Sequence, residues 1–387
     1  MSRSIYSPVL MALAVWVFAG ICSAEPWTVV SKEHVVAYHH PDRFCGWPAN
    51  GGFWMWGNEM AAAFEIGWWK DTDDGHHRDE SRANEDAIVR SLDGGQTWTM
   101  EMHVILGGDG PMFDPPSDID FTHPDFAYKA QGERFYISYD RGRNWLGKYP
   151  LATLGCGKLS TRTDYIVSSR NVCYFFSACE FDEDRAFAYR TTNAGASYEF
   201  LGWMGPDDET RSVMPSTVRL SDTKLISAMR RKRGGGDNWI DVYVSTNDGK
   251  NWQFLSKVAD TCCNNGNPPA MIRMNDGRVV CAYGYRGGDE GIRAKVSTDE
   301  GQSWSPEIRL RDDGLNWDLG YPRMVQRPDG KLVTVYYYCT REKPQQFIGA
   351  TIWELEGTTM TGGTDLNNDG AVNFLDFAIL LEDEDIL

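Results

Sequence analysis

The stretch Ser297-Thr298-Asp299-Glu300-Gly301-Gln302-Ser303-Trp304 is one of five segments in the chain that share a single pattern. The pattern is Ser-x-Asp-x-Gly-x-Thr-Trp with conservative exchanges, and it also begins at residues 91, 138, 191 and 245. The aromatic residues that close the segments stand at positions 98, 145, 198, 252 and 304, so neighbours are 47, 53, 54 and 52 residues apart. A period near fifty residues is typical of one four-stranded sheet of a β-propeller.

The residue types in these segments, which we call Asp-boxes, have a structural explanation. Asp or Asn caps a tight turn, Gly supplies a positive φ, and Trp packs between neighbouring sheets. Between the boxes run alternating strands around Asp-Gly turns, as in residues 271–283 and 324–337. One further hairpin unit, residues 319–353, and an early strand, residues 27–37, would close the ring. We therefore predict an all-β, six-bladed β-propeller over residues 25–357.

The charge of the chain restricts its partners. The 387 residues include 38 Lys+Arg and 55 Asp+Glu, which gives a formal net charge of −17. A diffuse negative field repels a polyanion, so nucleic acid is not expected as a partner. Any anion that binds must be held by locally clustered cations.

The N-terminus indicates export. Residues 1–24 have Arg3, an apolar stretch from Val9 to Ile21 and a small-residue end at Ala24, which predicts a signal peptide. We expect a secreted protein, extracellular or periplasmic, without a membrane span. Eight cysteines remain after the leader. Export permits disulfides, and the adjacent Cys262 and Cys263 could pair with two different partners or stay free.

The C-terminus predicts a calcium site. After a linker at 358–364, oxygen ligands recur at loop positions 1, 3, 5, 9 and 12, and Gly370 allows the turn at which a backbone carbonyl becomes a ligand. The expected ligands of Ca²⁺ are Asp365, Asn367, Asp369, the carbonyl of Ala371, Asn373 and Asp376. Residues 365–387 resemble one EF-hand-like half of a type I dockerin, which implies a cohesin-like or cell-surface partner. Only one of the family's two copies is present in these residues.

The Asp-boxes and the predicted blades resemble the sialidase (neuraminidase) superfamily over residues 26–356. The resemblance implies a glycan substrate with a terminal anionic sugar. It also implies three arginines that hold the sugar carboxylate, a Tyr nucleophile assisted by a Glu, and an Asp acid/base, with no cofactor for catalysis. Asp-boxes occur in propellers with other activities, so they are a stronger guide to fold than to function.

The resemblance points to particular arginines, whose planar guanidinium groups fit a carboxylate. Arg43, in the segment Asp42-Arg43-Phe44-Cys45-Gly46-Trp47-Pro48, matches the first, although it is displaced from its proline. Arg230 matches the second. Arg286 is our choice for the third, with Arg293 nearly as good. Arg162 belongs to a polar and aromatic cluster, 162–165, that could form the pocket wall.

The family acid stands in a loop before the first Asp-box, here residues 71–82. Counting back from Arg90-Ser91 leads to Glu80; we prefer Asp79 because the family acid is Asp, and keep Glu80 beside it. His76 and His77 are rivals, because an imidazole titrates near neutrality and can also ligate a metal. His77 is also a candidate for contact with the substrate.

The family nucleophile opens the last blade shortly before an Asp-Gly turn, and Tyr321 stands there. A phenol needs help to react, and a nearby cation such as Arg323 would favour the phenolate. Met214 stands where the family has its Glu, which is the main departure. The residues that could substitute are Glu180, Asp182 and Glu183.

Together these observations predict an enzyme similar to exo-α-sialidases, a glycoside hydrolase that releases terminal anionic sugars by a retaining mechanism with Tyr321 as nucleophile. One alternative is a propeller glycosidase or polysaccharide lyase that acts on uronic-acid glycans through His76 or His77. Another is a carbohydrate-binding propeller without catalysis.

Overall fold

A computed structural model describes residues 27–73, 75–106, 110–180, 184–233 and 236–356. The predicted signal peptide (1–24), the linker (358–364) and the calcium loop with its dockerin-like segment (365–387) lie outside the described residues.

Antiparallel strands form five sheets, and the only α-helix of the described residues is one turn long. The first sheet contains β2 (Arg43–Gly46), β3 (Phe53–Trp56), β4 (Glu59–Trp68), β5 (Glu85–Ser91) and β6 (Thr99–Met102), with α1 (Pro48–Gly51) between β2 and β3 and the 3₁₀ turn η1 (Val104–Leu106) after β6. The second contains β7 (Ala127–Gln131), β8 (Arg134–Ser138) and β9 (Leu146–Pro150).

The third and largest sheet contains β10 (Leu159–Ser169), β11 (Val172–Cys179), β12 (Arg185–Thr191), β13 (Glu199–Trp203), β14 (Arg211–Arg219), β15 (Leu225–Lys232), β16 (Asn238–Ser245) and β17 (Gln253–Asp260). A single parallel pair, Arg185 with Ser212, joins its β10–β13 part to its β14–β17 part. The fourth sheet contains β18 (Ala270–Arg273), β19 (Val279–Tyr285), β20 (Gly291–Ser297) and β21 (Ile308–Arg311). The fifth contains β22 (Gly320–Gln326), β23 (Leu332–Tyr338), β24 (Phe347–Leu355) and β1 (Val29–Tyr38).

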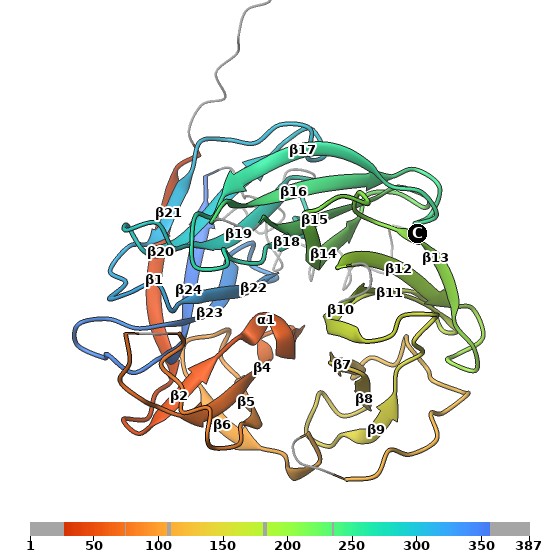
Figure 1. Ribbon diagram of the computed structural model, residues 1–387, viewed down its shortest axis with the longest axis horizontal. Helices are drawn as coiled ribbons and strands as arrows, with labels where there is room; N and C mark the ends of the chain where they lie inside the picture. Colours follow the sequence, from red (N-terminus) through yellow and green to blue (C-terminus); the bar gives the residue numbers. More distant parts are fainter. Residues whose placement is uncertain (1–26, 74, 107–109, 181–183, 234–235, 357–387) are drawn as a thin grey trace, which may run out of the picture.

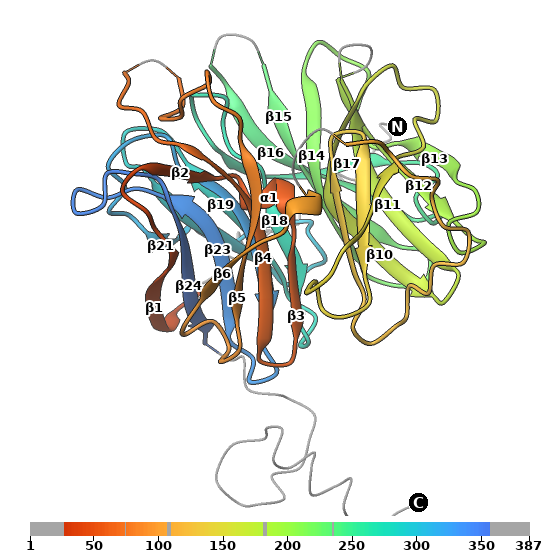
Figure 2. The ribbon, with the colours of Figure 1, turned by 90° about the horizontal axis from the view of Figure 1, so that it is seen from below.

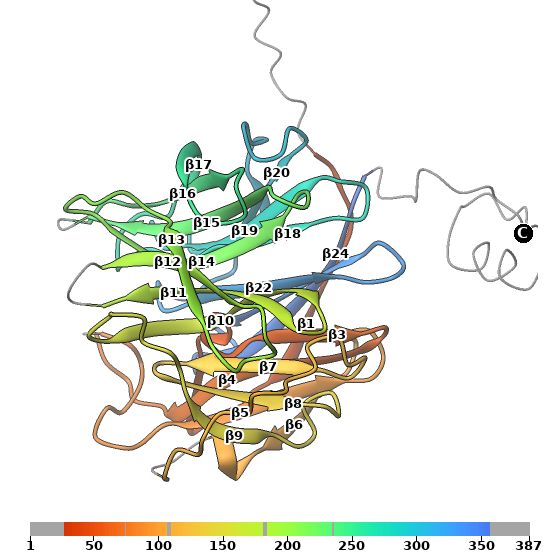
Figure 3. The same cartoon turned by 90° about the vertical axis from the view of Figure 1, so that its right-hand side faces the viewer.

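The sheets are arranged around a central axis, with β7, β10, β14, β18, β22 and α1 nearest to it (Figure 1). Seen from the side, the strands run between the two faces of the ring (Figure 2). In another side view, β16 and β17 lie at the opposite end of the molecule from β5 and β6 (Figure 3). The all-β propeller is thus confirmed, while the count of six blades stays a prediction.

The ring is closed by the two ends of the propeller. β1 pairs antiparallel with β24, from Val29 with Leu355 to Tyr38 with Ile348. The expected closing strand near residues 27–37 is therefore confirmed. Its backbone hydrogen bonds cover the outer edge of the last sheet, which would otherwise be open to other chains.

Each Asp-box has the same hydrogen bonds. In the box at 297–304, the Asp299 carboxylate accepts from the Ser303 amide at 2.9 Å and from the Ser297 hydroxyl at 2.7 Å, and Ser297 Oγ accepts from the Gly301 amide. The residue before the box glycine also has a positive φ in all five boxes: Gly94, Arg141, Ala194, Asp248 and Glu300. Such paired left-handed residues form the tight turns that join antiparallel strands.

Candidate functional site

The innermost strands bend at matching places. β10, β14 and β22 lose regular pairing at residues 162–164, 214–215 and 321–322. Met214 and Tyr321 have φ values of 60° and 51°, and each precedes a proline; Trp47, before Pro48, has φ 55°. Side chains rarely adopt this conformation, and a following proline opposes it further. Such bulges redirect side chains and concentrate at functional sites.

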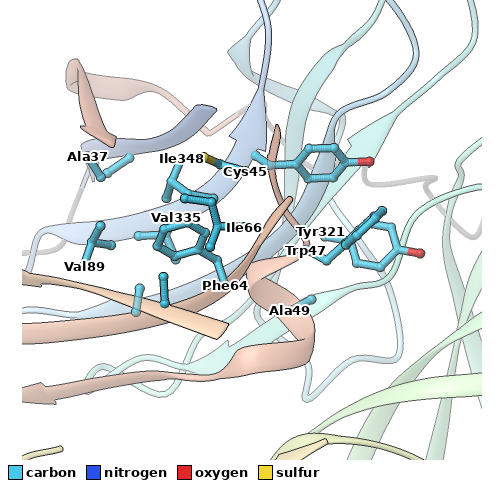
Figure 4. Close-up of a cluster of buried hydrophobic side chains, with 14 of the residues drawn as sticks. Ala37, Cys45, Trp47, Ala49, Phe64, Ile66, Val89, Tyr321, Val335 and Ile348 are labelled. Atoms are coloured by element: carbon cyan, nitrogen blue, oxygen red, sulfur yellow. The ribbon is translucent and has the colours of Figure 1, made fainter. Parts of the chain in front are cut away.

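The bends bring residues from distant parts of the chain together. Trp47, Met214 and Tyr321 belong to one buried cluster. In Figure 4, Trp47 and Tyr321 lie at one end of this cluster near Ala49, with Ala37 and Val89 at the other end.

Three arginines surround the Tyr321 ring. The guanidinium carbons of Arg162, Arg286 and Arg230 lie 5.3, 5.7 and 5.9 Å from its centroid. Arg230 Nη1 donates to the Tyr321 hydroxyl at 3.1 Å. The structure therefore brings together the predicted Tyr321, Arg230, Arg286 and Arg162.

Backbone carbonyls hold two of these arginines. Arg230 donates from Nε to the Asn265 carbonyl at 2.7 Å, with a second bond from Nη2, and its Nη1 also lies 3.0 Å from Met214 Sδ. Arg286 donates to the carbonyls of Leu319 and Asn264, each at 2.8 Å. Within the described residues, neither arginine is paired with a carboxylate, so no adjacent ion pair there neutralises their charges. By contrast, Nη1 of Arg162 is buried and has no hydrogen-bond partner among the described residues.

The main chain of Tyr321 is fixed as well. Its amide donates to Asn267 Oδ1 at 2.7 Å, and Asn267 Nδ2 donates to the Leu319 carbonyl. Gly320 has φ 110°, and a Cβ there would lie 2.2 Å from Asn267 Oδ1. Glycine is thus required at position 320, both because of its φ value and because a side chain would collide with Asn267. It leaves room for Asn267 to hold the main chain of Tyr321 in its bent conformation.

The electrostatic field changes the acidity of Tyr321. Burial alone would raise its pKa, but the charges of Arg230, Arg162 and Arg286 outweigh burial and lower the pKa to about 7. The field extends to Lys232, two residues beyond Arg230 on β15; burial and the charge of Arg230 lower its pKa to about 8. The site therefore favours an anion, including the phenolate itself.

A buried carboxylate lies beside this cluster. Asp318 accepts from His76 Nδ1 at 2.6 Å, from the His77 amide at 2.9 Å and from the Tyr337 hydroxyl at 2.8 Å. Burial opposes ionisation of Asp318, but the hydrogen bonds from the two histidines hold its pKa well below its usual range. Tyr337 also accepts from Arg286 Nη2 at 2.8 Å, so Asp318 is linked to the arginines.

The two histidines differ in their surroundings. His76 packs edge-on against Trp47 with ring centroids 5.1 Å apart, and its side chain is 29% exposed. With Nδ1 bonded to the carboxylate, Nε2 is the nitrogen left to exchange a proton. The Asp318 carboxylate, with Oδ2 3.5 Å from His77 Nδ1, raises the pKa of His77.

The predicted acids lie near His76, although not against Tyr321. Asp79, Glu80 and His76 line a cavity of about 390 Å³ in the β4–β5 loop. Hydrogen bonds from Ser81 lower the pKa of Asp79, which is the wrong direction for a proton donor. Glu80 is exposed and pairs with Arg78 at 3.3 Å.

Other predicted residues lie elsewhere. Arg43 bonds the Gly67 carbonyl and Glu85, each at 2.8 Å, and is not among the arginines over Tyr321. Arg293 pairs with Glu307 at 3.1 Å and Asp289 at 3.3 Å. Neither side chain is brought to the Tyr321 cluster.

Arg323 is not among the arginines whose guanidinium groups lie over the Tyr321 ring. It donates from Nη2 to the Ala49 carbonyl at 2.7 Å. It instead acts on the buried Asp164, whose pKa burial raises to about 7 against the opposing charge of Arg323.

Of the carboxylates considered as substitutes at Met214, only Glu180 belongs to the described residues. Glu180 pairs with Lys158 at 3.2 Å, and Asp182 and Glu183 lie outside the described residues. Sequence reasoning missed Asp318, Asn267 and Tyr337. A signal was available: Pro322 lies inside a predicted strand and so marks a bulge, and Asp318 lies four residues before it.

Within the described residues, no three or more His, Cys, Asp and Glu side chains are grouped so as to bind a metal ion. Nor does that part of the chain contain a helix with the length and apolar character needed to cross a membrane.

Known proteins share this architecture. The profile of a family described as "BNR repeat-like domain" matches residues 25–334. A protein of unknown function from Dyadobacter fermentans superposes with a TM-score of 0.64 at 21% identity, covering 86% of this chain and all of the other. No curated protein matches the sequence.

Two enzymes of known activity are also similar in structure. The NanB sialidase of Streptococcus pneumoniae has a TM-score of 0.56 at 10% identity, covering 83% of this chain and 70% of its own. The α-L-arabinofuranosidase Arb93A of Fusarium graminearum has a TM-score of 0.53 at 13% identity, covering 84% and 97%. At these identities the similarity establishes the fold alone.

Proposed function

The chain belongs to the BNR repeat-like domain family, and on that basis we propose that it is a propeller glycosidase that cleaves a glycan at a carboxylated sugar. The observation that carries the proposal is the Tyr321 phenol, which lies among three arginines and accepts a hydrogen bond from Arg230 at 3.1 Å. A sugar carboxylate would supply the acceptor that the buried Nη1 of Arg162 lacks. The structural similarity to a sialidase and an arabinofuranosidase supports a glycosidase.

In the proposed reaction, Arg162, Arg230 and Arg286 hold the carboxylate and Tyr321 is the nucleophile. The phenolate oxygen forms a bond to the anomeric carbon while the glycosidic bond breaks, and its electron pair leaves with the aglycone oxygen. Water then attacks the anomeric carbon, the bond from the anomeric carbon to the Tyr321 oxygen breaks, and the sugar is released with return of the phenolate. A pKa of about 7 makes the reactive form abundant at neutral pH.

We assign the proton donor to His76 in preference to the predicted Asp79. Asp318 orients His76 through Nδ1 at 2.6 Å, whereas hydrogen bonds from Ser81 favour the charged form of Asp79. His76 Nε2 would protonate the leaving oxygen and later take a proton from the attacking water.

The proposal is tested by assaying a fluorogenic sialoside and a panel of uronide glycosides. Tyr321→Phe is expected to reduce kcat by roughly 1,000-fold or more. The matched control is Tyr136→Phe, which removes a buried phenol that donates to the Leu106 carbonyl at 3.4 Å. Equal activity of Tyr321→Phe and wild type would contradict the nucleophile. Binding of these glycans without turnover would identify a carbohydrate-binding propeller instead.

A second candidate is a polysaccharide lyase that acts on uronic-acid glycans. Two observations favour it: Met214 replaces the Glu expected beside the tyrosine, and a His-Asp pair lies at the site. His76 would remove the proton at C5 while the arginines neutralise the carboxylate; the resulting electron pair forms the C4–C5 double bond, and the O4 leaving group takes a proton from Tyr321. The products separate the candidates, because only elimination creates an ultraviolet-absorbing unsaturated sugar.

A further inference from the structure

The adjacent cysteines Cys262 and Cys263 lie next to Arg286, one of the three arginines around Tyr321. Their Sγ atoms are 3.0 Å apart, and both side chains are partly exposed. Cys263 Sγ also lies 3.0 Å from the backbone carbonyl of Arg286, to which it donates. A second pair of cysteines, Cys156 and Cys179, lies in the β10–β11 region and is already joined by a disulfide.

The loop that begins with these cysteines holds the site arginines. The two residues that follow them offer their carbonyls to the guanidinium groups: Asn264 to Arg286 at 2.8 Å, and Asn265 to Arg230 Nε at 2.7 Å. The positions of both guanidinium groups therefore depend on where this loop places the carbonyl oxygens of Asn264 and Asn265.

The backbone of the loop has little freedom. Residues 262, 264, 265 and 266 all have positive φ values. The Cys262 carbonyl accepts from Asn238 Nδ2 at 2.6 Å, and the Cys263 carbonyl accepts from the Gly266 amide at 2.9 Å. A covalent change between the two thiols would reorient the peptide that joins them and thereby disturb these bonds.

We propose that Cys262 and Cys263 are a site of reversible oxidation to a vicinal disulfide, and that closure of this bond loosens the hold of the loop on Arg230 and Arg286. The oxidant is a small-molecule disulfide. One cysteine thiolate attacks it, forms a mixed disulfide and releases one thiol; the second cysteine then attacks the mixed disulfide and releases the other thiol. The protein loses two protons and two electrons, which the reagent carries away as two thiols.

Closure has two consequences for the site. Cys263 loses the S–H that donates to the Arg286 carbonyl, and the eight-membered ring constrains the peptide that precedes Asn264 and Asn265. Both changes act on arginines that lower the pKa of Tyr321. Oxidation is therefore expected to raise that pKa and to weaken carboxylate binding. The second effect rests on the proposed function, and the first does not.

The test uses the full chain treated with oxidised glutathione under mildly alkaline conditions, because the hydrogen bond with Cys262 raises the pKa of Cys263. Peptide mass mapping is expected to show a Cys262–Cys263 disulfide. The ultraviolet titration of Tyr321, taken as the difference between wild type and Tyr321→Phe, is expected to shift upward by about half a pH unit or more. Dithiothreitol, at a dose that leaves Cys156–Cys179 intact in the same mass map, should reverse the shift.

Matched variants separate the outcomes. Cys263→Ser and Cys263→Ala cannot close the bond and should not respond to oxidation, while Cys281→Ser, which removes a buried cysteine of β19, should respond like wild type. The absence of a 262–263 disulfide, or closure without a shift in the Tyr321 titration, would overturn the inference. A shift in a protein that cleaves no glycan would refute the proposed function and leave this inference standing.

Discussion

At the scale of single residues, the site is defined by positive charge that lacks a carboxylate partner. Arg230 and Arg286 bond carbonyl oxygens, and these neutral acceptors leave the charge available to the Tyr321 phenol or to a ligand. Arg90 shows the contrast, because it pairs with both Glu59 and Glu101 and has a structural role.

The first prediction concerns the titration of Tyr321. The phenolate band of wild type minus Tyr321→Phe should have its midpoint near pH 7. Arg162→Gln and Arg230→Gln should each move the midpoint upward, because each removes a charge that stabilises the phenolate. Arg43→Gln is the control and should leave it unchanged, since Arg43 pairs with Glu85. A midpoint near 10 in wild type would contradict the arrangement of the cluster.

The same ionisation predicts a pH profile for activity. Because kcat/KM reports the free enzyme, it should rise as Tyr321 loses its proton near pH 7 and fall again at higher pH, where the proton donor is deprotonated. In Arg162→Gln the rise should move to higher pH. An identical acid limb in the variant and in wild type would argue against the phenolate as the reactive form.

Asp164 predicts an effect on stability. Burial raises its pKa to about 7, so the folded state binds this proton more tightly than the unfolded state. Its contribution is fully present below the unfolded pKa and is lost as the pH rises through about 7. Asp164→Asn should keep the bond from Thr217 Oγ1 and gain stability relative to wild type between pH 4 and 8, by about 1–3 kcal/mol in urea unfolding. A difference that does not vary with pH would contradict this assignment.

Site residues could be predicted from the sequence where their positions can be counted from a repeated turn. They could not be predicted where their positions depend on contacts with residues distant in the sequence. Arg230 and Tyr321 could be located by counting from an Asp-box or an Asp-Gly turn. Arg43 could not, because the pairing of Arg43 with Trp68 directs its side chain toward Glu85, away from the bend at Trp47. Asp318 could not be recognised, because its partners His76 and Tyr337 lie far away in the sequence or on another strand.

At the scale of elements, the Asp-boxes fix the turns that determine strand order. Five copies of one local hydrogen-bond pattern could be predicted because every bond joins residues within four positions of each other. The bulges of β10, β14 and β22 depend instead on contacts between sheets, such as Asn267 with Tyr321. Prolines 215 and 322 signal them, without revealing the direction of the side chains.

An Asp-box variant tests the structural role of these segments. Asp299→Ala removes bonds from the Ser303 amide, the Ser303 hydroxyl and the Ser297 hydroxyl. Unfolding free energy in urea should fall by about 1–2 kcal/mol, while the Tyr321 titration stays unchanged. Asp299→Asn is the matched control, because the boxes at 193 and 247 already use Asn. A change in the Tyr321 midpoint would show that the boxes influence the site directly.

At the scale of the whole molecule, the propeller depends on one non-local pairing. β1 and β24 are separated by most of the described chain and yet form a ladder of eight partner pairs. This closure could be predicted from the repeat, because the last unit lacked a strand and the chain had one left over. The grouping of Tyr321 with Arg162, Arg230 and Arg286 could not be predicted to the same extent, since it requires bends in several sheets to meet at one place.

Ring closure can be tested by truncation. A chain that begins at residue 39 lacks β1 and should have a thermal midpoint lower by roughly 10 °C or more than a chain that begins at residue 25. Removal of residues 357–387 is the control, because β24 ends at Leu355 and keeps its pairing. Equal midpoints for the two N-terminal variants would show that closure contributes little.

The bends at Trp47, Met214 and Tyr321 have a consequence for how such proteins diversify. The left-handed conformation at each persists although Pro48, Pro215 and Pro322 oppose it, and at Tyr321 it is held by the Gly320–Asn267 contact and not by the side chain itself. The side chain at each of these positions can therefore be exchanged without a change in the backbone. A substitution at 214 would therefore change the group that faces Arg230 Nη1, and with it the substrates that the site accepts, while the ring that carries the site stays the same.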